Sequence, residues 1–225
     1  MSVSFANDDI PKAIYPNISL TSSTIEGFTP RGWYVEHQQK GDLNSDGIDD
    51  VVLVLHEKNT KNILKNEGLG AEVTDTNPRV LLVAVRDKVS DKYIKLVENH
   101  TLIPRHTDPM LEDPLTENAI KISKGNLIIR LEYFANAGSW EMFSATFTFR
   151  KEDQCLRLIG YDRVNTHRAS GETSDISINF LTNKAKVSRG SIEDENLRPK
   201  WQSIKSSKKH CIQDIGNGLE FTPPL

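Results

Sequence analysis

Two stretches in the middle of the chain alternate strictly between apolar and polar side chains, which is the pattern of a half-buried β-strand. In NLIIRLEYF the residues Leu127, Ile129 and Leu131 share one face of the expected strand. In WEMFSATFTFR the residues Phe147 and Phe149 do the same. Because one face of each strand has to be covered, the chain is expected to build a sheet against an apolar core.

Further segments rich in β-branched and aromatic residues are also predicted strands, and they begin at Gly32, Val51, Arg79, Lys92, Ala119, Cys155, Asp175 and Lys184. The continuous apolar runs VVLVL and RVLLVAV predict strands that are covered on both faces. Turns are predicted at Asp87 to Asp91, Lys124 to Asn126 and Leu181 to Asn183. Helix is sparse: one of two or three turns is predicted from Lys58 to Gly68, and SIEDENLRPKW is expected to hold another short turn.

These patterns predict a mainly β fold, with a single antiparallel β-rich domain over residues 1–225 and one or two short helices. The expected architecture is a sandwich or a curved meander sheet, partly propeller-like. Residues 1–15 are expected to form a flexible N-terminal segment, and residues 190–225 a loop-rich C-terminal segment. A second long loop is predicted from Arg105 to Glu117, and such loops often carry binding residues.

The charge balance and hydropathy restrict the partners. The 28 basic and 31 acidic residues give a formal net charge of -3, so the overall field favours neither nucleic acid nor an anionic membrane. The basic cluster of Lys205, Lys208, Lys209 and His210 lacks interleaved aromatic residues and is interpreted as a solvated tail. No apolar run approaches the roughly 20 residues of a membrane helix. We therefore expect no nucleic-acid partner and no membrane span.

The segment GDLNSDGIDD places oxygen-bearing side chains at alternate positions, Asp42, Asn44 and Asp46. A hard cation such as Ca²⁺ takes about six to eight oxygen ligands, and a chain that wraps the ion supplies them from alternate residues. Gly47 permits the sharp turn, after which a backbone carbonyl and a further carboxylate complete the shell. The predicted cofactor is Ca²⁺, and the predicted ligands are Asp42, Asn44, Asp46, Ile48 and Asp50.

Other interpretations of this segment remain open or are excluded. Mg²⁺ fits less well, because it prefers a rigid and partly hydrated octahedral shell. The segment can also be an acidic β-turn without a metal, held by Asx hydrogen bonds. An EF-hand is excluded, because its twelfth position requires a bidentate Glu and here it is Leu53.

The nine-position spacing D-x-N-x-D-G-x-x-D, followed by VVLVL, resembles the calcium loops of FG-GAP repeats in integrin-like β-propellers and bacterial extracellular proteins. The resemblance covers the segment from Trp33 to Leu55 and implies the same ligands. Propellers repeat the unit several times and this chain contains it once, so a full propeller is not expected. The order of the motif and the following strands looks like a group of bacterial exported proteins, which implies a periplasmic or secreted location.

The N-terminus and the cysteines bear on export. The tripeptide Ser4 to Ala6 is similar to the end of a signal peptide, but the positive and apolar regions that should precede it are absent. The chain is either a mature exported protein starting near Asn7 or a cytoplasmic protein with a frayed end. Cys155 and Cys211 are the two cysteines, and export favours a disulfide between them over two free thiols.

A search for catalytic motifs finds no H-E-x-x-H pair, no G-x-S-x-G elbow and no phosphate-binding Gly loop. His37 and His56 flank the acidic segment and are expected to be surface histidines, while Trp140 is expected in the core. We therefore expect a non-enzymatic, calcium-stabilised periplasmic β-protein that binds another protein. By analogy it is an immunity protein that neutralises a secreted antibacterial effector; the alternatives are an envelope-polymer hydrolase or a carbohydrate-binding module.

Overall fold

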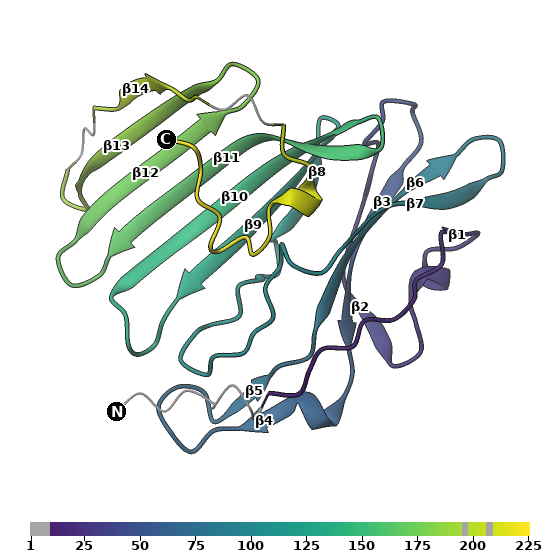
Figure 1. The fold of residues 1–225 in the computed structure, drawn as a ribbon, viewed down its shortest axis with the longest axis horizontal. Helices are drawn as coiled ribbons and strands as arrows, with labels where there is room; N and C mark the ends of the chain where they lie inside the picture. The colour runs from purple at the N-terminus through teal and green to yellow at the C-terminus, as the bar shows by residue number, and fades with distance from the viewer. Residues whose placement is uncertain (1–9, 195–197, 206–208) are drawn as a thin grey trace.

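Antiparallel strands dominate the computed structural model, which describes residues 10–194, 198–205 and 209–225 (Figure 1). A five-stranded sheet has the order β1-β7-β6-β3-β2 and consists of β1 (Thr21–Ser22), β2 (Trp33–Gly41), β3 (Asp50–Glu57), β6 (Arg79–Asp87) and β7 (Lys92–Asn99). A seven-stranded sheet runs from β14 to β8 and consists of β8 (Ile120–Ser123), β9 (Asn126–Phe134), β10 (Glu141–Glu152), β11 (Cys155–His167), β12 (Glu172–Asn179), β13 (Lys184–Ser191) and β14 (Lys200–Ser203). The predicted mainly β, antiparallel fold is confirmed.

Smaller elements complete the described residues. A hairpin is formed by β4 (Ile63–Lys65) and β5 (Val73–Asp75). Three 3₁₀ turns are η1 (Glu26–Phe28), η2 (Thr60–Asn62) and η3 (Ile212–Asp214). No helix in the described ranges is long and apolar enough to cross a membrane.

The larger sheet is a meander in which each strand pairs with the next one along the chain. Two of its connections lie where the sequence predicts turns, at Lys124 to Asn126 and at Leu181 to Asn183. Lys124 and Asn183 adopt left-handed backbone conformations with φ of 51° and 53°, and Gly125 follows with φ of 74°. Glycine reaches such angles without steric cost, and asparagine tolerates them better than most residues. Turn chemistry therefore decides where this sheet reverses.

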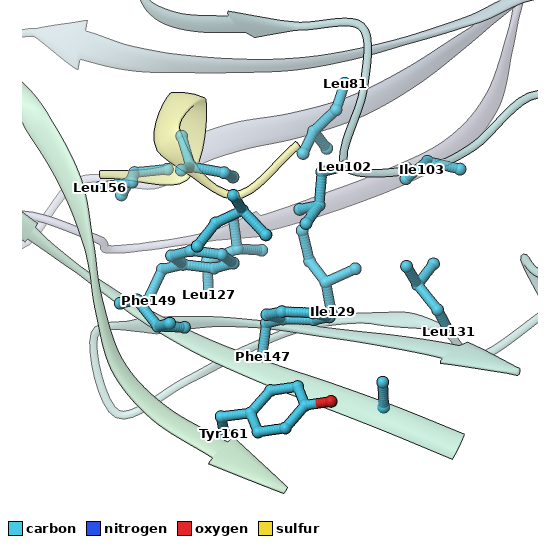
Figure 2. Close-up of a cluster of buried hydrophobic side chains, with 14 of the residues drawn as sticks. Leu81, Leu102, Ile103, Leu127, Ile129, Leu131, Phe147, Phe149, Leu156 and Tyr161 are labelled. Atoms are coloured by element: carbon cyan, nitrogen blue, oxygen red, sulfur yellow. The ribbon is translucent and has the colours of Figure 1, made fainter. Parts of the chain in front are cut away.

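The apolar faces of the two sheets meet in one core (Figure 2). Leu127 and Ile129 of β9 and Phe147 and Phe149 of β10 are fully buried, as their alternation predicts. Leu81 of the smaller sheet belongs to the same cluster. Burying a side chain of this size contributes about 1.5–3 kcal/mol, so the shared core holds the sheets together.

The smaller sheet is covered on its second face by the N-terminal part of the chain. Ile18 and Phe28 pack there against Val51, Leu53 and Leu55. All but the last residue of β3 are buried. The prediction that VVLVL is covered on both faces is therefore confirmed.

The C-terminal segment lies over the inner face of the larger sheet (Figure 1). The ring of Phe221 lies 5.1 Å from that of Tyr161 and 5.6 Å from that of Phe147, between centroids. Cys155 and Cys211 form a disulfide with their Cα atoms 5.7 Å apart, so the predicted bridge is confirmed. It ties the segment to the start of β11.

Several expectations from sequence need correction. The helix predicted from Lys58 to Gly68 is wrong: η2 occupies one turn, and β4 then pairs with β5. The physical reason is that the Asn59 side chain accepts from the Lys61 amide and closes a tight turn, after which cross-strand pairing stabilises an extended chain. Trp140 was expected in the core and is 62% exposed.

The terminal segments differ in part from their expected character. Within residues 190–225, β14 and η3 interrupt the expected loops. Tyr15, at the end of the segment expected to be flexible, stacks on His100 with ring centroids 3.9 Å apart. The tripeptide Ser4 to Ala6 and the residue Lys208 lie outside the described residues.

Candidate functional site

The predicted calcium loop connects the end of β2 to the start of β3. Ser45 and Gly47 have positive φ angles of 60° and 84°, so the chain turns twice in the left-handed region. These turns bring Asp42, Asn44 and Asp46 together: Asn44 Nδ2 donates to Asp46 Oδ2 at 3.1 Å, and the Asp46 amide donates to Asp42 Oδ1 at 3.2 Å. The compact turn that the motif predicts is present.

The carboxylates of this loop accept hydrogen bonds from backbone amides. Asp42 Oδ2 accepts from the Gly47 amide at 2.8 Å, and Asp46 Oδ1 accepts from the Ile48 amide at 2.8 Å. The amide of Gly47, with those of neighbouring residues, holds the pKa of Asp42 below its usual value. The Lys88 ammonium donates a hydrogen bond to the Asp46 carbonyl. The loop is thus a hydrogen-bonded acidic turn with a cationic side chain beside it.

Asp50 differs from the other acids because its side chain is fully buried. Its two oxygens accept from the amides of Leu43 and Arg86, both at 2.9 Å. Burial raises the pKa of Asp50, and the negative charges of Asp46 and Asp42 raise it further, although the two amides oppose the shift. Asp50 therefore carries a charge that burial and its neighbours disfavour.

The donor set fits a hard cation, because it consists of carboxylate and amide oxygens. Its present arrangement does not form a closed shell. Within the described part of the chain, no three or more His, Cys, Asp or Glu side chains are grouped so that they can hold a metal ion. An ion would have to share or replace the hydrogen bonds that Asp42 and Asp46 now accept.

A second charged cluster lies at the other end of β3, and sequence reasoning missed it. Tyr34, His56 and Arg79 occupy paired positions on three neighbouring strands. A bulge in β2 adds Glu36 to the same group. His56, expected at the surface, is only 3% exposed, and its Nδ1 lies 2.9 Å from the Tyr34 hydroxyl. His37 pairs with Val54 instead, so the two histidines do not meet.

Arg79 links this cluster to the loop from Arg105 to Glu117, hereafter loop 105–117. Its guanidinium donates to both oxygens of Glu36, at 2.6 and 2.7 Å, and to both oxygens of Asp113, at 3.1 and 2.6 Å. Burial alone would raise the pKa of Glu36, but hydrogen bonds from His56 and Arg79 lower it to about 2. The loop is therefore fastened to the smaller sheet by a bidentate contact between the buried Arg79 guanidinium and the 38% exposed carboxylate of Asp113.

A groove lies between loop 105–117, the larger sheet and the C-terminal segment. Its floor contains Tyr133 and Phe143, whose rings stack with centroids 4.9 Å apart. Arg163 covers Phe143 at 3.7 Å. The carboxylate-bearing residues that line it from loop 105–117 and the C-terminal segment are Asp108, Glu112 and Glu220. Glu132 of β9 also lines it, but its side chain is on the other face of the strand, where it pairs with Arg130. We call this feature the acid-rimmed groove.

The known proteins offer no template for these features. No family model, no curated protein and no solved structure matches the chain.

Proposed function

We propose that the protein is an exported, non-enzymatic β-protein that binds another protein in the acid-rimmed groove. The observation that carries the proposal is that the groove is preformed by a fastened loop. A binding surface that is ordered in advance loses less conformational entropy when the partner arrives. The long polar loop predicted from sequence thereby acquires a defined shape.

Backbone contacts hold loop 105–117 against the larger sheet along its length. The Glu112 amide donates to the Phe134 carbonyl at 2.9 Å, and the Asn136 amide donates to the Met110 carbonyl at 2.8 Å. His106 Nε2 lies 2.8 Å from the Leu111 carbonyl and closes the tip of the loop. Together with the Asp113 contact to Arg79, these bonds support a rigid surface rather than an adaptable one.

The composition of the groove suits a partner with a basic segment. An aromatic floor surrounded by charged groups is the usual anatomy of a protein interface, with an apolar centre and a polar rim. Asp108, Glu112 and Glu220 bring three carboxylates to this floor. Arg105 directs its guanidinium away toward the carbonyls of Thr76 and Pro11, and Arg163 stacks on Phe143. Complementary charge would speed encounter and select the partner.

Export and an effector-neutralising role belong to the same proposal. The disulfide between Cys155 and Cys211 supports an oxidising compartment such as the periplasm, because cytosolic thiols are kept reduced. In that compartment we assign the protein the role of an immunity protein, which masks a basic surface of a secreted antibacterial effector. Ca²⁺ would serve as a structural ion in the loop from Asp42 to Asp50, where it would offset the disfavoured charge of Asp50.

The hydrolase alternative requires a cleft with two carboxylates, one of which has a strongly raised pKa. Asp50 is a carboxyl group whose pKa is raised, and both of its oxygens are bound to backbone amides. It therefore lends no support to general acid catalysis. The carbohydrate-binding alternative involves a different surface, beside Trp201 of β14.

The proposal can be tested by capture of secreted proteins from the source cell on the immobilised, disulfide-bonded protein. The variant Glu112→Lys/Glu220→Lys reverses two exposed charges of the groove and should abolish capture of a specific partner. Glu26→Lys reverses an exposed charge on η1 and should leave capture unchanged. The captured protein, directed to the periplasm of a test bacterium, should stop growth unless this protein is co-expressed.

Two outcomes would contradict the proposal. One is a partner retained equally by the groove variant and the control. The other is a captured partner that does not affect bacterial growth. In that case this protein would still be a binding protein, but it would not be an immunity protein.

A further inference from the structure

The outer face of the larger sheet carries a hollow beside the edge strand β14, with a volume of about 690 Å³. Three strands contribute side chains to it in two rows. One row runs from Ser177 of β12 through Lys186 of β13 to Trp201 of β14, and the other joins Asn179, Lys184 and Ser203. Their neighbours Ile178 and Ala185 point into the core. The rows therefore line the hollow with polar side chains and end at an indole ring.

The hollow is positively charged. Lys184 and Lys186 lie two positions apart on one strand, so their attachment points are separated by about 6.6 Å. Among the described residues, none that lines the hollow carries a carboxylate. Within the described residues, neither ammonium group takes part in a hydrogen bond or an ion pair. Two unpaired cations beside one another favour an anionic ligand.

Trp201 supplies a flat apolar face at the edge of the hollow. Its side chain is 69% exposed, and it makes no aromatic or cation-π contact with the described part of the chain. An exposed indole beside unpaired cations offers a flat apolar face on which a ligand ring can stack. The ring can stack on the C–H face of a sugar.

We propose that this hollow binds an acidic saccharide, with Trp201 stacked on a sugar ring and Lys184 and Lys186 bound to its carboxylate. The hydroxyl groups of Ser177 and Ser203 and the amide of Asn179 supply donors and acceptors for sugar hydroxyls. The site is separate from the acid-rimmed groove and does not depend on the protein partner.

Single-stranded nucleic acid also combines negative charge with rings that stack on tryptophan. Two observations favour the saccharide. The whole chain has a formal net charge of -3, whereas nucleic-acid-binding domains are usually basic. The disulfide between Cys155 and Cys211 favours an oxidising compartment outside the cytosol, where acidic polysaccharides are common and nucleic acid is scarce.

The test is calorimetric titration of the intact, disulfide-bonded protein with a tetramer of galacturonic acid, with a galactose tetramer and single-stranded oligothymidylate as comparisons. We expect millimolar or tighter affinity for the acidic tetramer. Trp201→Ala should weaken binding about tenfold or more, and Lys184→Gln/Lys186→Gln should do the same, since each lost contact of 1.4 kcal/mol is a factor of ten. Trp140→Ala removes another exposed indole and should change nothing.

The result would overturn the proposal if the acidic tetramer does not bind, if the galactose tetramer binds equally well, or if oligothymidylate binds more tightly. Unchanged affinity in Trp201→Ala would also overturn it. All substituted residues are exposed, and thermal unfolding of each variant verifies that it folds. Glu112→Lys/Glu220→Lys should keep its saccharide affinity, so this test is independent of the protein-binding proposal.

Discussion

At the scale of single residues, Arg79 is the group whose loss should matter most for stability. Its side chain is only 4% exposed and neutralises Glu36 and Asp113. Arg79→Leu should lower the free energy of unfolding by about 3–5 kcal/mol, because it leaves two carboxylates without their buried partner. Urea unfolding measures this. Arg130→Leu breaks an exposed pair with Glu132 and should lower the free energy of unfolding by no more than about 1 kcal/mol. Equal losses in the two variants would contradict the conclusion that the ion pairs of Arg79 stabilise the fold more than an exposed pair does.

Glu36 should make stability depend on acidic pH. Its pKa is about 2 in the folded protein against an ordinary value of 4.5. Because the folded-state pKa is the lower one, the stabilisation is complete above about pH 4.5 and is lost as the pH falls through about 2. After allowance for partial screening by solvent, we expect about 2 kcal/mol.

Urea unfolding between pH 6 and pH 2 tests this pH dependence. The decline should be steeper in the wild-type protein than in Glu36→Gln, which has no carboxyl group to protonate. Parallel profiles for the two proteins would show that Glu36 does not contribute.

The charged cluster around Arg79 could be predicted only in part from the sequence. The sequence places a charged residue at the start of an apolar strand, which is a signal that Arg79 needs a partner. The partners could not be identified, because Glu36 reaches Arg79 through a bulge in β2, and Asp113 comes from a loop 34 residues away. A bulge changes which face a residue occupies, and the period of two does not reveal it.

At the scale of elements, the loop from Asp42 to Asp50 should respond to Ca²⁺. Removal of Ca²⁺ by a chelator should lower the melting temperature, because an ion that binds only the folded state stabilises it. Asp46→Ala should remove this sensitivity. Asp49→Ala changes an exposed carboxylate of the same loop that is outside the predicted ligand set, and should keep it. A wild-type melting curve that is identical with and without chelator would contradict the calcium assignment. The loop would then be an acidic turn that binds no metal.

Hairpins were predictable from sequence, and the β4–β5 region was not. The strands of the larger sheet pair with their neighbours in the chain, so alternation and local turn residues suffice to place all of them except β14, which lies in a segment expected to be loop-rich. The segment from Lys58 to Gly68 has helix-forming lysines and a Gly at its end. Its true partner is β5, and a preference for pairing with another strand outweighs weak helix propensity.

At the scale of the whole molecule, both sheets contribute to one core, and the protein should unfold as one cooperative unit. Val54 and Leu81 of the smaller sheet belong to the same cluster as Phe147 of the larger one. Unfolding in urea, followed by far-UV and near-UV circular dichroism, should give coincident transitions. Two separated transitions would contradict the prediction of a single domain over residues 1–225.

The sequence by itself determined the fold class, most of the longer strands, several of their turns and the cysteine pair available for a disulfide, because alternation, turn residues and composition act over a few neighbouring positions. It also identified the loop from Asp42 to Asp50 as an oxygen-rich turn. Only the tertiary structure decided that two sheets share a core, that His56 is buried, and that Trp201 lies beside Lys184 and Lys186. These facts depend on which distant segments pack together, and burial and electrostatic environment are properties of that packing rather than of local sequence.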